Sequence, residues 1–407
     1  MRATTLLNRI VKVDGASVRS VKVKDDGAIT VWLRRRAVLL RCPFCAHTTR
    51  ARYDRHDSAW RHLDLARTRV ELRCEVRRLL CPTHGVVSEE LAWARPGSRF
   101  TRDFEDVVAY LTREAPKSCV AQLMRIGWPT VGRIIERVVV EQVDTARLEG
   151  LYRIGIDEVS YRKGHRYLTC VADHDRPRIV WAEEGKSAAT LGRFFEELGP
   201  TRCQAIEAIS IDMSGAWQKA IARHAPGAVV CFDPFHVVKL AGDALDALRR
   251  AEWQRLRKLD PDRAAWMKGA RFALRRRPEL LRQKERERLA AIERHNKPLY
   301  RGYLLKEQLR AIYATADAHE AEDLLRQWLS WAQRSRLVQF VKLARTIRAY
   351  FDGIISAIRL GLTNARLEGL NATVRLISHR ARGFASAQAI LAMIQLRCGG
   401  IVVELPT

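Results

Sequence analysis

The sequence of 407 residues lacks any apolar run of the roughly 18 residues that a membrane-spanning helix needs, so we expect no integral membrane protein. Residues 1–13 alternate apolar and polar side chains without a long apolar core, which argues against a secretory signal. Internal repeats and low-complexity tracts are missing as well. Hydrophobic residues make up 47% and charged residues 29% of the chain, values that exclude a mainly disordered chain, a collagen or a coiled coil.

Acidic residues are scarce relative to basic ones, 46 against 72, and the formal net charge is +26. The surplus lies in three separated stretches. Residues 1–84 hold 19 basic and 8 acidic residues, residues 249–288 hold 15 and 6, and residues 334–382 hold 10 and 2. Most of the basic residues are arginines, whose planar fork suits phosphate. The pattern favours a nucleic-acid partner, with a solvated basic surface as the alternative.

The order of apolar patterns predicts an α+β protein of several domains. Residues 1–95 have strand character. Residues 101–147 carry three short apolar stripes at helical spacing, with Gly127 in the second turn, as in a helix-turn-helix. Residues 151–240 alternate strands and helices in the order βββαβαβα. Residues 241–350 show almost no strand signal, and residues 351–400 are helical again.

Two acidic residues follow apolar strands in the third segment. Asp157 follows residues 151–156, and Asp212 follows residues 205–211. In this strand order the first and fourth strands should be parallel neighbours, which would bring both carboxylates together. Two adjacent carboxylates repel each other unless a cation lies between them, and Mg²⁺ is bound in this way. The alternative is that each aspartate is a turn former or helix cap.

A third acid, Glu368, lies in a basic segment where only Asp352 accompanies it. Its charge pattern fits two interpretations equally well. It could complete a cation site with Asp157 and Asp212, or it could form a salt bridge with Arg366 or Arg375.

Near the amino end, Cys42-Pro-Phe-Cys45 and Cys81-Pro-Thr-His84 are each a two-ligand knuckle. Together they predict a structural Cys3His zinc site with four protein ligands. Cys74 could replace His84 as a ligand, and His47 is another candidate. Buried thiols are the alternative interpretation for the whole group. The chain has nine cysteines, an odd number, which favours a reducing compartment over disulfides.

The helical triplet at 101–147 is the candidate sequence reader, with residues 128–137 as its recognition helix. Arg133 and Arg137 are its obvious basic contacts. A triplet of helices that serves only to pack is the alternative.

Several motifs in order resemble those of ISL-three-type insertion-sequence transposases, over nearly the whole chain from the cysteine pairs to about residue 397. The motifs are Gly155-Ile-Asp-Glu158 with Arg162-Lys-Gly-His-Arg-Tyr167, Asp233-Pro-Phe-His236 with Lys239, Thr363-Asn-Ala-Arg-Leu-Glu-Gly-Leu-Asn371, and Arg380-Ala-Arg-Gly-Phe384.

The resemblance implies an RNase H-like catalytic core with a DDE triad. At the matching positions of this sequence the triad would be Asp157, Asp212 and Glu368, which would also bind Mg²⁺ or Mn²⁺. Asp233 and His236 match an Asp-x-x-His element of related transposases and would lie near the site, as would Asn371 at the end of its motif. Asp233 also ends a strand, but Asp212 is preferred because its strand should neighbour the first.

The resemblance further implies an all-helical insertion between the second Asp and the Glu, and a zinc-binding domain at the amino end. The implied partners are duplex DNA, as terminal inverted repeats and as target, and a second copy of the chain on paired ends. The expected location is cytoplasmic, at the bacterial nucleoid. The arginines expected to contact DNA are Arg133, Arg137, Arg275, Arg276, Arg277, Arg366, Arg375, Arg380 and Arg382.

The function expected from these features is metal-dependent DNA cleavage and strand transfer at the ends of an insertion element. Two alternatives remain at this stage. A non-catalytic regulator built on the zinc and helix-turn-helix modules would explain the charge but leave residues 151–400 without a role. A nuclease with the same core would cut DNA without strand transfer.

Overall fold

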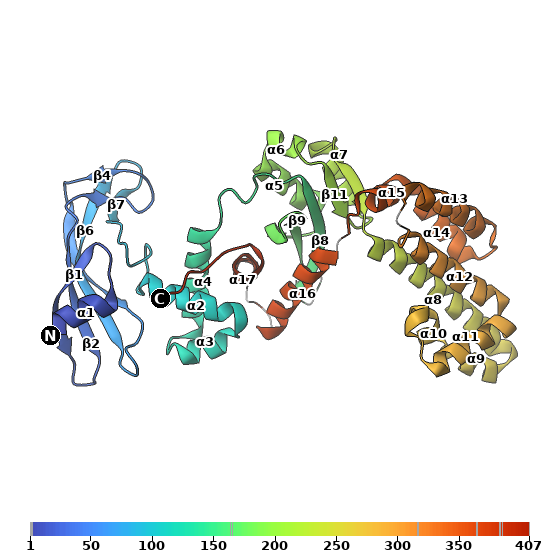
Figure 1. The fold of residues 1–407 in the computed structure, drawn as a ribbon, viewed down its shortest axis with the longest axis horizontal. Coiled ribbons are helices and arrows are strands. Elements are labelled where there is room, and N and C mark those ends of the chain that lie inside the picture. The colour runs from blue at the N-terminus through green and yellow to red at the C-terminus, as the bar shows by residue number, and fades with distance from the viewer. Residues whose placement is uncertain are drawn as a thin grey trace. The chain divides into compact units, whose positions relative to one another are not determined.

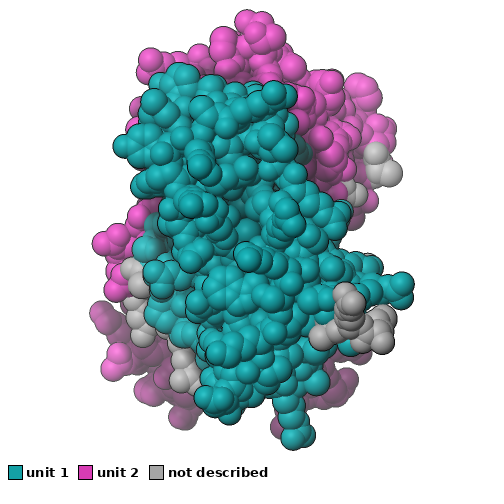
Figure 2. All heavy atoms as spheres, turned by 90° about the vertical axis from the view of Figure 1, so that its left-hand side faces the viewer, with its two compact units in different colours: residues 1–144, 380–407 teal, residues 145–379 magenta. Residues whose placement is uncertain are grey.

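A computed structural model describes residues 3–162, 164, 166–315, 317–363, 365–381, 384 and 386–406. The chain forms two compact units, one made of residues 1–144 with 380–407 and the other of residues 145–379 (Figure 2). No helix within the described residues is both long enough and apolar enough to cross a membrane. None of the nine cysteines, all of which are described, is in a disulfide.

The first unit begins with a β-rich part (Figure 1). After helix α1 (Ala3–Val11), a five-stranded sheet has the order β1-β2-β6-β5, with β7 paired to β6. Its strands are β1 (Ala16–Val23), β2 (Ile29–Arg35), β5 (Asp54–Arg61), β6 (Val70–Cys81) and β7 (Gly85–Ser88). The β1–β2 turn contains Gly27 at a φ of +81°, a conformation that glycine adopts without steric cost.

The core of this β-rich part comes from alternate residues of the strands. On β6, Val70, Leu72, Cys74 and Val76 are buried, and the residues between them are more exposed. This period of two is what a strand with one face on the core requires. Trp60 of β5 packs edge-on against Trp93 in the same core, with ring centroids 5.8 Å apart.

Three helices follow and match the expected helix-turn-helix: α2 (Arg102–Glu114), α3 (Lys117–Leu123) and α4 (Trp128–Gln142). The Thr101 hydroxyl caps α2 by accepting the backbone N–H of Phe104. Pro129 lies in the first turn of α4, where its missing N–H costs nothing. The last helix of the chain, α17 (Ala387–Cys398), packs against α2 and α4.

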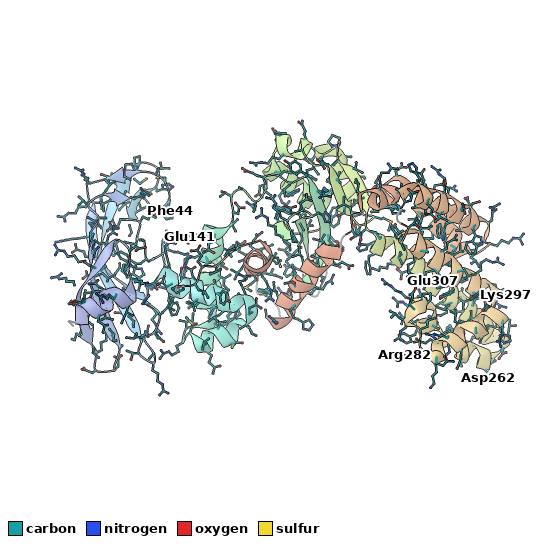
Figure 3. The ribbon with its side chains drawn as sticks, viewed as in Figure 1. Phe44, Glu141, Asp262, Arg282, Lys297 and Glu307 are labelled. Carbon is teal, nitrogen blue, oxygen red and sulfur yellow. The ribbon has the colours of Figure 1, made fainter. Side chains whose placement is uncertain are left out.

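A buried ion-pair network joins the loop before α2 to these helices. The Arg95 guanidinium is 3% exposed and donates to Glu105, Asp106 and Glu141 at 3.3, 2.7 and 2.6 Å. Glu105, itself 0% exposed, also accepts from Arg137 Nε at 2.8 Å. Charges buried in this way must be paired, so the network fixes the loop on the helices. Figure 3 labels Glu141 at its edge on α4.

The second unit contains a five-stranded mixed sheet of order β10-β9-β8-β11-β12. Its strands are β8 (Arg153–Arg162), β9 (Arg166–Asp173), β10 (Arg178–Glu184), β11 (Ala208–Ile211) and β12 (Val229–Phe232). β8, β9 and β10 pair antiparallel, whereas β11 pairs parallel to both β8 and β12. The expectation that the first and fourth strands of this segment are parallel neighbours is confirmed.

One strand boundary differs from the sequence-based expectation. β8 does not end at Asp157 but continues to Arg162, because Asp157 and the residues after it pair antiparallel with β9. Only its pairing with β11, at residues 153–155, stops before Asp157. A strand that pairs with two neighbours can therefore continue along one of them after its pairing with the other has ended.

Helices complete the second unit. Those between the strands are α5 (Ala188–Leu198), α6 (Pro200–Gln204) and α7 (Gly215–His224). The helical region that follows consists of α8 (Pro234–Leu259), α9 (Pro261–Lys268), α10 (Arg271–Arg275), the 3₁₀ turn η1 (Pro278–Leu280), α11 (Gln283–His295), α12 (Lys297–Ile312), α13 (Ala318–Arg334), α14 (Val338–Ala349) and α15 (Phe351–Leu360). Charged residues such as Asp262, Arg282 and Lys297 stand along its surface (Figure 3).

Residues 351–400, expected as one segment, divide between the units. Helix α15 packs against β12, and α16 (Ala365–Arg380) belongs to the second unit up to residue 379. Residues 380–407, including α17, belong to the first unit. The domain boundaries predicted from the sequence otherwise stay predictions.

Candidate functional site

Three aspartates lie at the same level along three adjacent parallel strands. The β8–β11 register pairs Ser210 with Gly155, so two residues further on Asp212 lies opposite Asp157. The β11–β12 register pairs Ile211 with Phe232, so Asp233 lies opposite Asp212. We call Asp157, Asp212 and Asp233 the acid row. Neighbouring strands are about 4.8 Å apart, so these side chains are close enough to interact.

The electrostatics of the acid row are those of crowded, partly buried carboxylates. Burial raises the pKa of Asp157 to about 6, and the charges of Asp212 and Asp233 add to the effect, against a backbone N–H bond and His236. Burial also raises the pKa of Asp212, with a further increase from Asp233. Such carboxylates are ionised at low cost only when a cation is close, so the row fits a divalent ion.

His236 lies one turn into α8 and faces the acid row. Its Nδ1 is 3.0 Å from Asp233 Oδ2. That hydrogen bond raises the pKa of His236, burial opposes the increase, and the charges of all three aspartates support it. The Asp-x-x-His spacing therefore makes a local pair, because residues three apart share one face at a helix start.

Glu368 and Asn371 come from α16. The Nδ2 of Asn371 donates to Asp157 Oδ2 at 2.5 Å, and α16 accordingly lies beside β8 (Figure 1). Glu368 lies one turn earlier on the same helix, and its side chain is exposed. Within the described residues, neither Glu368 with Asp157 and Asp212 nor the acid row with His236 forms a close group of metal ligands. The predicted triad of Asp157, Asp212 and Glu368 thus stays a prediction.

The four expected zinc ligands come together from two turns. Cys42 and Cys45 follow β3 (Leu40–Arg41), which pairs with β4 (Thr48–Thr49), while Cys81 and His84 stand in the turn between β6 and β7. The Sγ and ring nitrogen atoms all lie within 4.8 Å of one another. Phe44 of the first turn, labelled in Figure 3, packs against the ring of His84, with the centroids of the two rings 5.5 Å apart.

The distances in this group are compatible with a tetrahedral ion. Cys45 and Cys81 Sγ are 3.6 Å apart, and His84 Nδ1 lies 3.7 Å from Cys42 Sγ and 3.6 Å from Cys81 Sγ. A tetrahedron with Zn–S bonds of about 2.3 Å has edges of about 3.8 Å. Burial would raise the pKa of the Cys81 thiol, but hydrogen bonds from His84 and Thr83 outweigh it and lower that pKa to about 6.

Comparison with known proteins shows to which family this chain belongs. A family described as "Transposase" matches residues 154–394, a range that includes Asp157, Asp212 and Glu368. A second family, described as "Helix-turn-helix domain of transposase family ISL3", matches residues 89–139. The chain belongs to the ISL3 family of transposases. The family implies an enzyme that modifies DNA, uses a divalent metal ion and binds DNA through its helix-turn-helix.

Two curated relatives extend the match over the full length. The chain is 38% identical to the transposase for insertion sequence element IS1557 of Mycobacterium tuberculosis, with 100% of this chain and 98% of the relative covered. It is 29% identical to the transposase for insertion sequence element IS1001 of Bordetella parapertussis, with 91% and 92% covered.

The arginines of this ISL3 transposase that were expected to contact DNA fall into two groups. Arg133, Arg275, Arg277 and Arg375 are exposed. Three others have protein partners: Arg137 donates to Glu105, Arg276 to Glu285 at 2.9 Å, and Arg380 to the Glu114 carbonyl at 3.0 Å. The side chain of Arg366 and the whole of Arg382 lie outside the described residues.

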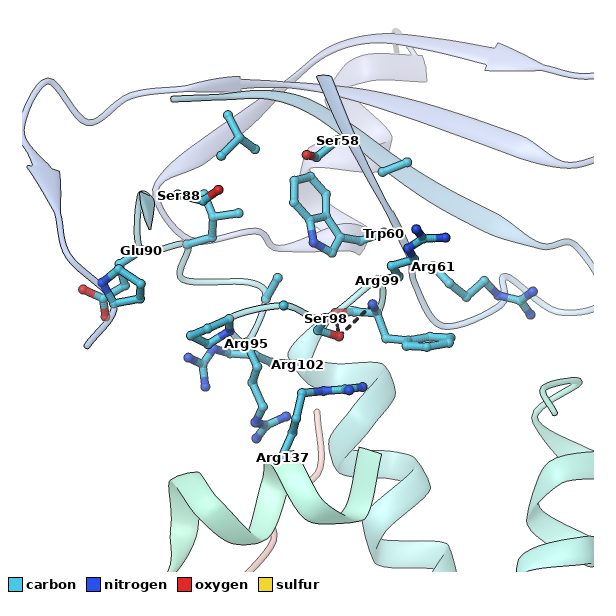
Figure 4. Close-up of a pocket in the computed structure, with 18 of the residues that line it drawn as sticks. Ser58, Trp60, Arg61, Ser88, Glu90, Arg95, Ser98, Arg99, Arg102 and Arg137 are labelled. Carbon is cyan, nitrogen blue, oxygen red and sulfur yellow. Dashed lines mark hydrogen bonds between the residues drawn. The ribbon is translucent and has the colours of Figure 1, made fainter. Parts of the chain in front are cut away.

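A groove with a volume of about 1350 Å³ opens in the first unit between the sheet and α4 (Figure 4). Seven arginines and six acidic residues line it. Figure 4 shows Arg61, Arg95, Arg99, Arg102 and Arg137 around it, beside Trp60. Because Arg95, Arg102 and Arg137 pair with Glu141 or Glu105, the cationic surface of this groove comes from the exposed Arg69, Arg99 and Arg133.

Sequence reasoning missed two residues near the acid row. Lys186, in the loop before α5, contributes a positive charge that lowers the pKa of Asp212 against burial. Tyr313, which follows α12, is a buried phenol whose pKa is raised by burial and by Asp233. Neither stands in a local motif, and only the Lys-Ser step before a helix could have drawn attention to Lys186.

Proposed function

We propose that this chain is the transposase of an insertion element, and that it cuts the ends of the element and joins them to target DNA. The acid row carries the proposal, because two of its carboxylates, Asp157 and Asp212, lie opposite each other on adjacent parallel strands and, in a chain of this family, are suited to hold divalent ions. The mixed sheet with antiparallel β8–β10 and parallel β11 and β12 supports an RNase H-like core.

In this proposal Asp157, Asp212 and Glu368 bind Mg²⁺ or Mn²⁺. Divalent ions held there would activate a water and stabilise the charge of the attacking and leaving oxygens. Asp233 orients His236 through Nδ1, and the imidazole offers a polar contact for the DNA strand at the edge of the row. Protein groups here contribute position and charge rather than covalent chemistry.

The first unit would hold the terminal inverted repeats as duplex DNA, with zinc as a structural ion at the four-ligand group. The protein would act at the bacterial nucleoid. Because two ends must be joined to one target, we propose a homodimer that pairs two ends.

Strand transfer tests the proposal most directly. With Mg²⁺, an element-end duplex that already carries a free 3′-hydroxyl should be joined to a second duplex, and an intact end should first be nicked. Gel analysis of labelled ends separates the outcomes. Cleavage without joining would indicate a nuclease, and end binding without cleavage would indicate a regulator.

The two candidate arginines of α4 should behave oppositely when changed to alanine. Arg133→Ala should leave the free energy of unfolding within about 0.5 kcal/mol of the parent, because the side chain is exposed. It should lower the salt dependence of duplex binding, the slope of log K against log salt, by about one. Arg137→Ala should cost about 1–3 kcal/mol, because Glu105 loses a partner in a buried network.

Thermal melts and fluorescence anisotropy with an end duplex at several salt concentrations measure both effects. A destabilised Arg133→Ala beside an unaffected Arg137→Ala would contradict the assignment.

A further inference from the structure

A buried amide on α16 contacts the first residue of the acid row. Asn371 is 0% exposed, and its Nδ2 donates to Asp157 Oδ2 at 2.5 Å across 214 positions of the sequence. The Oδ1 of the same amide is also buried, and it has no hydrogen-bond partner within the part of the chain that the structure describes. A buried polar atom without a partner is costly and rare, so it points to a group that is bound there in the working protein.

The two oxygens of Asp157 are each held by a neutral donor. Oδ1 accepts the backbone N–H of Glu158 at 2.7 Å, and Oδ2 accepts Asn371. Neutral donors orient a carboxylate without cancelling its charge, whereas an arginine or lysine at position 371 would take the place of a cation. Each oxygen of Asp157 keeps a further lone pair for a metal ion.

The same bond fixes the helix that carries Glu368. Residues three apart on a helix are neighbours, so Glu368 stands one turn from Asn371 on α16. Asn371 is buried, whereas Glu368 is exposed. A shift of α16 along β8 would break the Asn371–Asp157 bond and move Glu368 with it.

We propose that Asn371 is a positioning residue that orients Asp157 toward the divalent ion and holds α16, the helix that carries Glu368, against β8. Its Oδ1 supplies a further hard, neutral oxygen, of the kind that Mg²⁺ and its bound waters prefer. This inference rests on the proposed function.

The test compares the full-length chain with Asn371→Ala, Asn371→Asp and Asp157→Asn, at saturating zinc. Thr373→Ala is the matched control, because this threonine of α16 only donates to the Gly369 carbonyl within the same helix. Three quantities are measured for each: the Mn²⁺-induced rise in Tm, the Mn²⁺ concentration for half-maximal end cleavage, and the Kd for an end duplex without added Mn²⁺.

We expect Asn371→Ala to bind the duplex as the parent does, to need at least ten times more Mn²⁺ for half-maximal cleavage, and to lose most of the Mn²⁺-induced rise in Tm. Thr373→Ala should match the parent in all three. Asn371→Asp is nearly isosteric and should fold even if the alanine variant does not. Its second carboxylate beside Asp157 should lower Tm without Mn²⁺ and enlarge the rise on adding Mn²⁺.

Parent-like Mn²⁺ dependence in either Asn371 variant that folds would overturn the inference, as would slower cleavage at an unchanged half-maximal Mn²⁺ concentration. The Asp157→Asn variant separates this failure from that of the proposed function. If that variant keeps both the Mn²⁺-induced rise and cleavage, the acid row is not the metal site at all.

Discussion

Changing Asp157 or Asp212 to asparagine should reduce end cleavage and strand transfer at least about 10³-fold, which corresponds to about 4 kcal/mol of transition-state stabilisation. Each change keeps the size of the side chain and removes one charge from the acid row. The asparagine at position 212 can still accept the backbone N–H of Ser214, so the turn before α7 should survive. Cleavage of a labelled end duplex with Mg²⁺ measures the loss.

The same variants should be no less stable than the parent when the metal ion is absent. Both carboxyls have raised pKa values in the folded protein, so their ionised forms are unfavourable there at neutral pH, and removing one charge relieves the repulsion. Duplex binding should also be unchanged. Asp175→Asn is the control, because this aspartate pairs with Arg153 at the surface, outside the acid row. A control that lost cleavage to the same extent would refute a special role for the row.

The sequence predicted those parts of the site that depend on a single strand, a single helical turn or the order of the strands. The alternation of strands and helices over residues 151–240 was expected, and α5, α7 and α8 stand at the helical positions of that order. The parallel pairing of β8 and β11 followed from the strand order, and it is what brings Asp157 and Asp212 together. The Asp-x-x-His spacing likewise needs only one helical turn.

The partners of individual arginines could not be predicted, because they come from remote parts of the chain. Arg137 reaches Glu105 from another helix, and Arg380 reaches the end of α2 across 266 positions. No periodicity marks such partners, so an arginine in a basic stretch looks the same whether it is exposed or paired. The extension of β8 past Asp157 was missed for a similar reason, because its partner over those residues is β9 and not β11.

The sequence contains a pattern that distinguishes Cys74 from the four zinc ligands, although the choice between Cys74 and His84 was left open. Cys74 alternates with Leu72 and Val76 on β6, and this period of two places its thiol in the core of the sheet. Cys81 ends the same strand and turns toward Cys45. Cys74 and His47 are both described and both lie outside the close four-ligand group.

Loss of zinc should abolish end binding by unfolding the amino-terminal turns. Structural zinc contributes about 10–16 kcal/mol in small zinc modules. Within the described residues, the fully buried apolar side chains that pack with the cysteine ligands are Leu40 and Leu79, so the core around the ion is small. We therefore expect Cys81→Ser to lose its zinc, to lower the Tm of the first unit and to weaken duplex binding at least about 100-fold, or about 2.7 kcal/mol. Metal analysis of the purified protein should give one zinc per chain for the parent and none for the variant.

Two cysteine variants make this result specific. Cys74→Ala removes a thiol from the core of the sheet and should cost stability yet keep one zinc per chain. Cys119→Ser changes an exposed thiol on α3 and should leave zinc, Tm and binding unchanged. If Cys81→Ser kept its zinc while Cys74→Ala lost it, the ligand set would have to be redrawn around β6. Because the acid row lies in the other unit, Cys81→Ser should still respond to Mn²⁺, which separates the structural ion from the catalytic one.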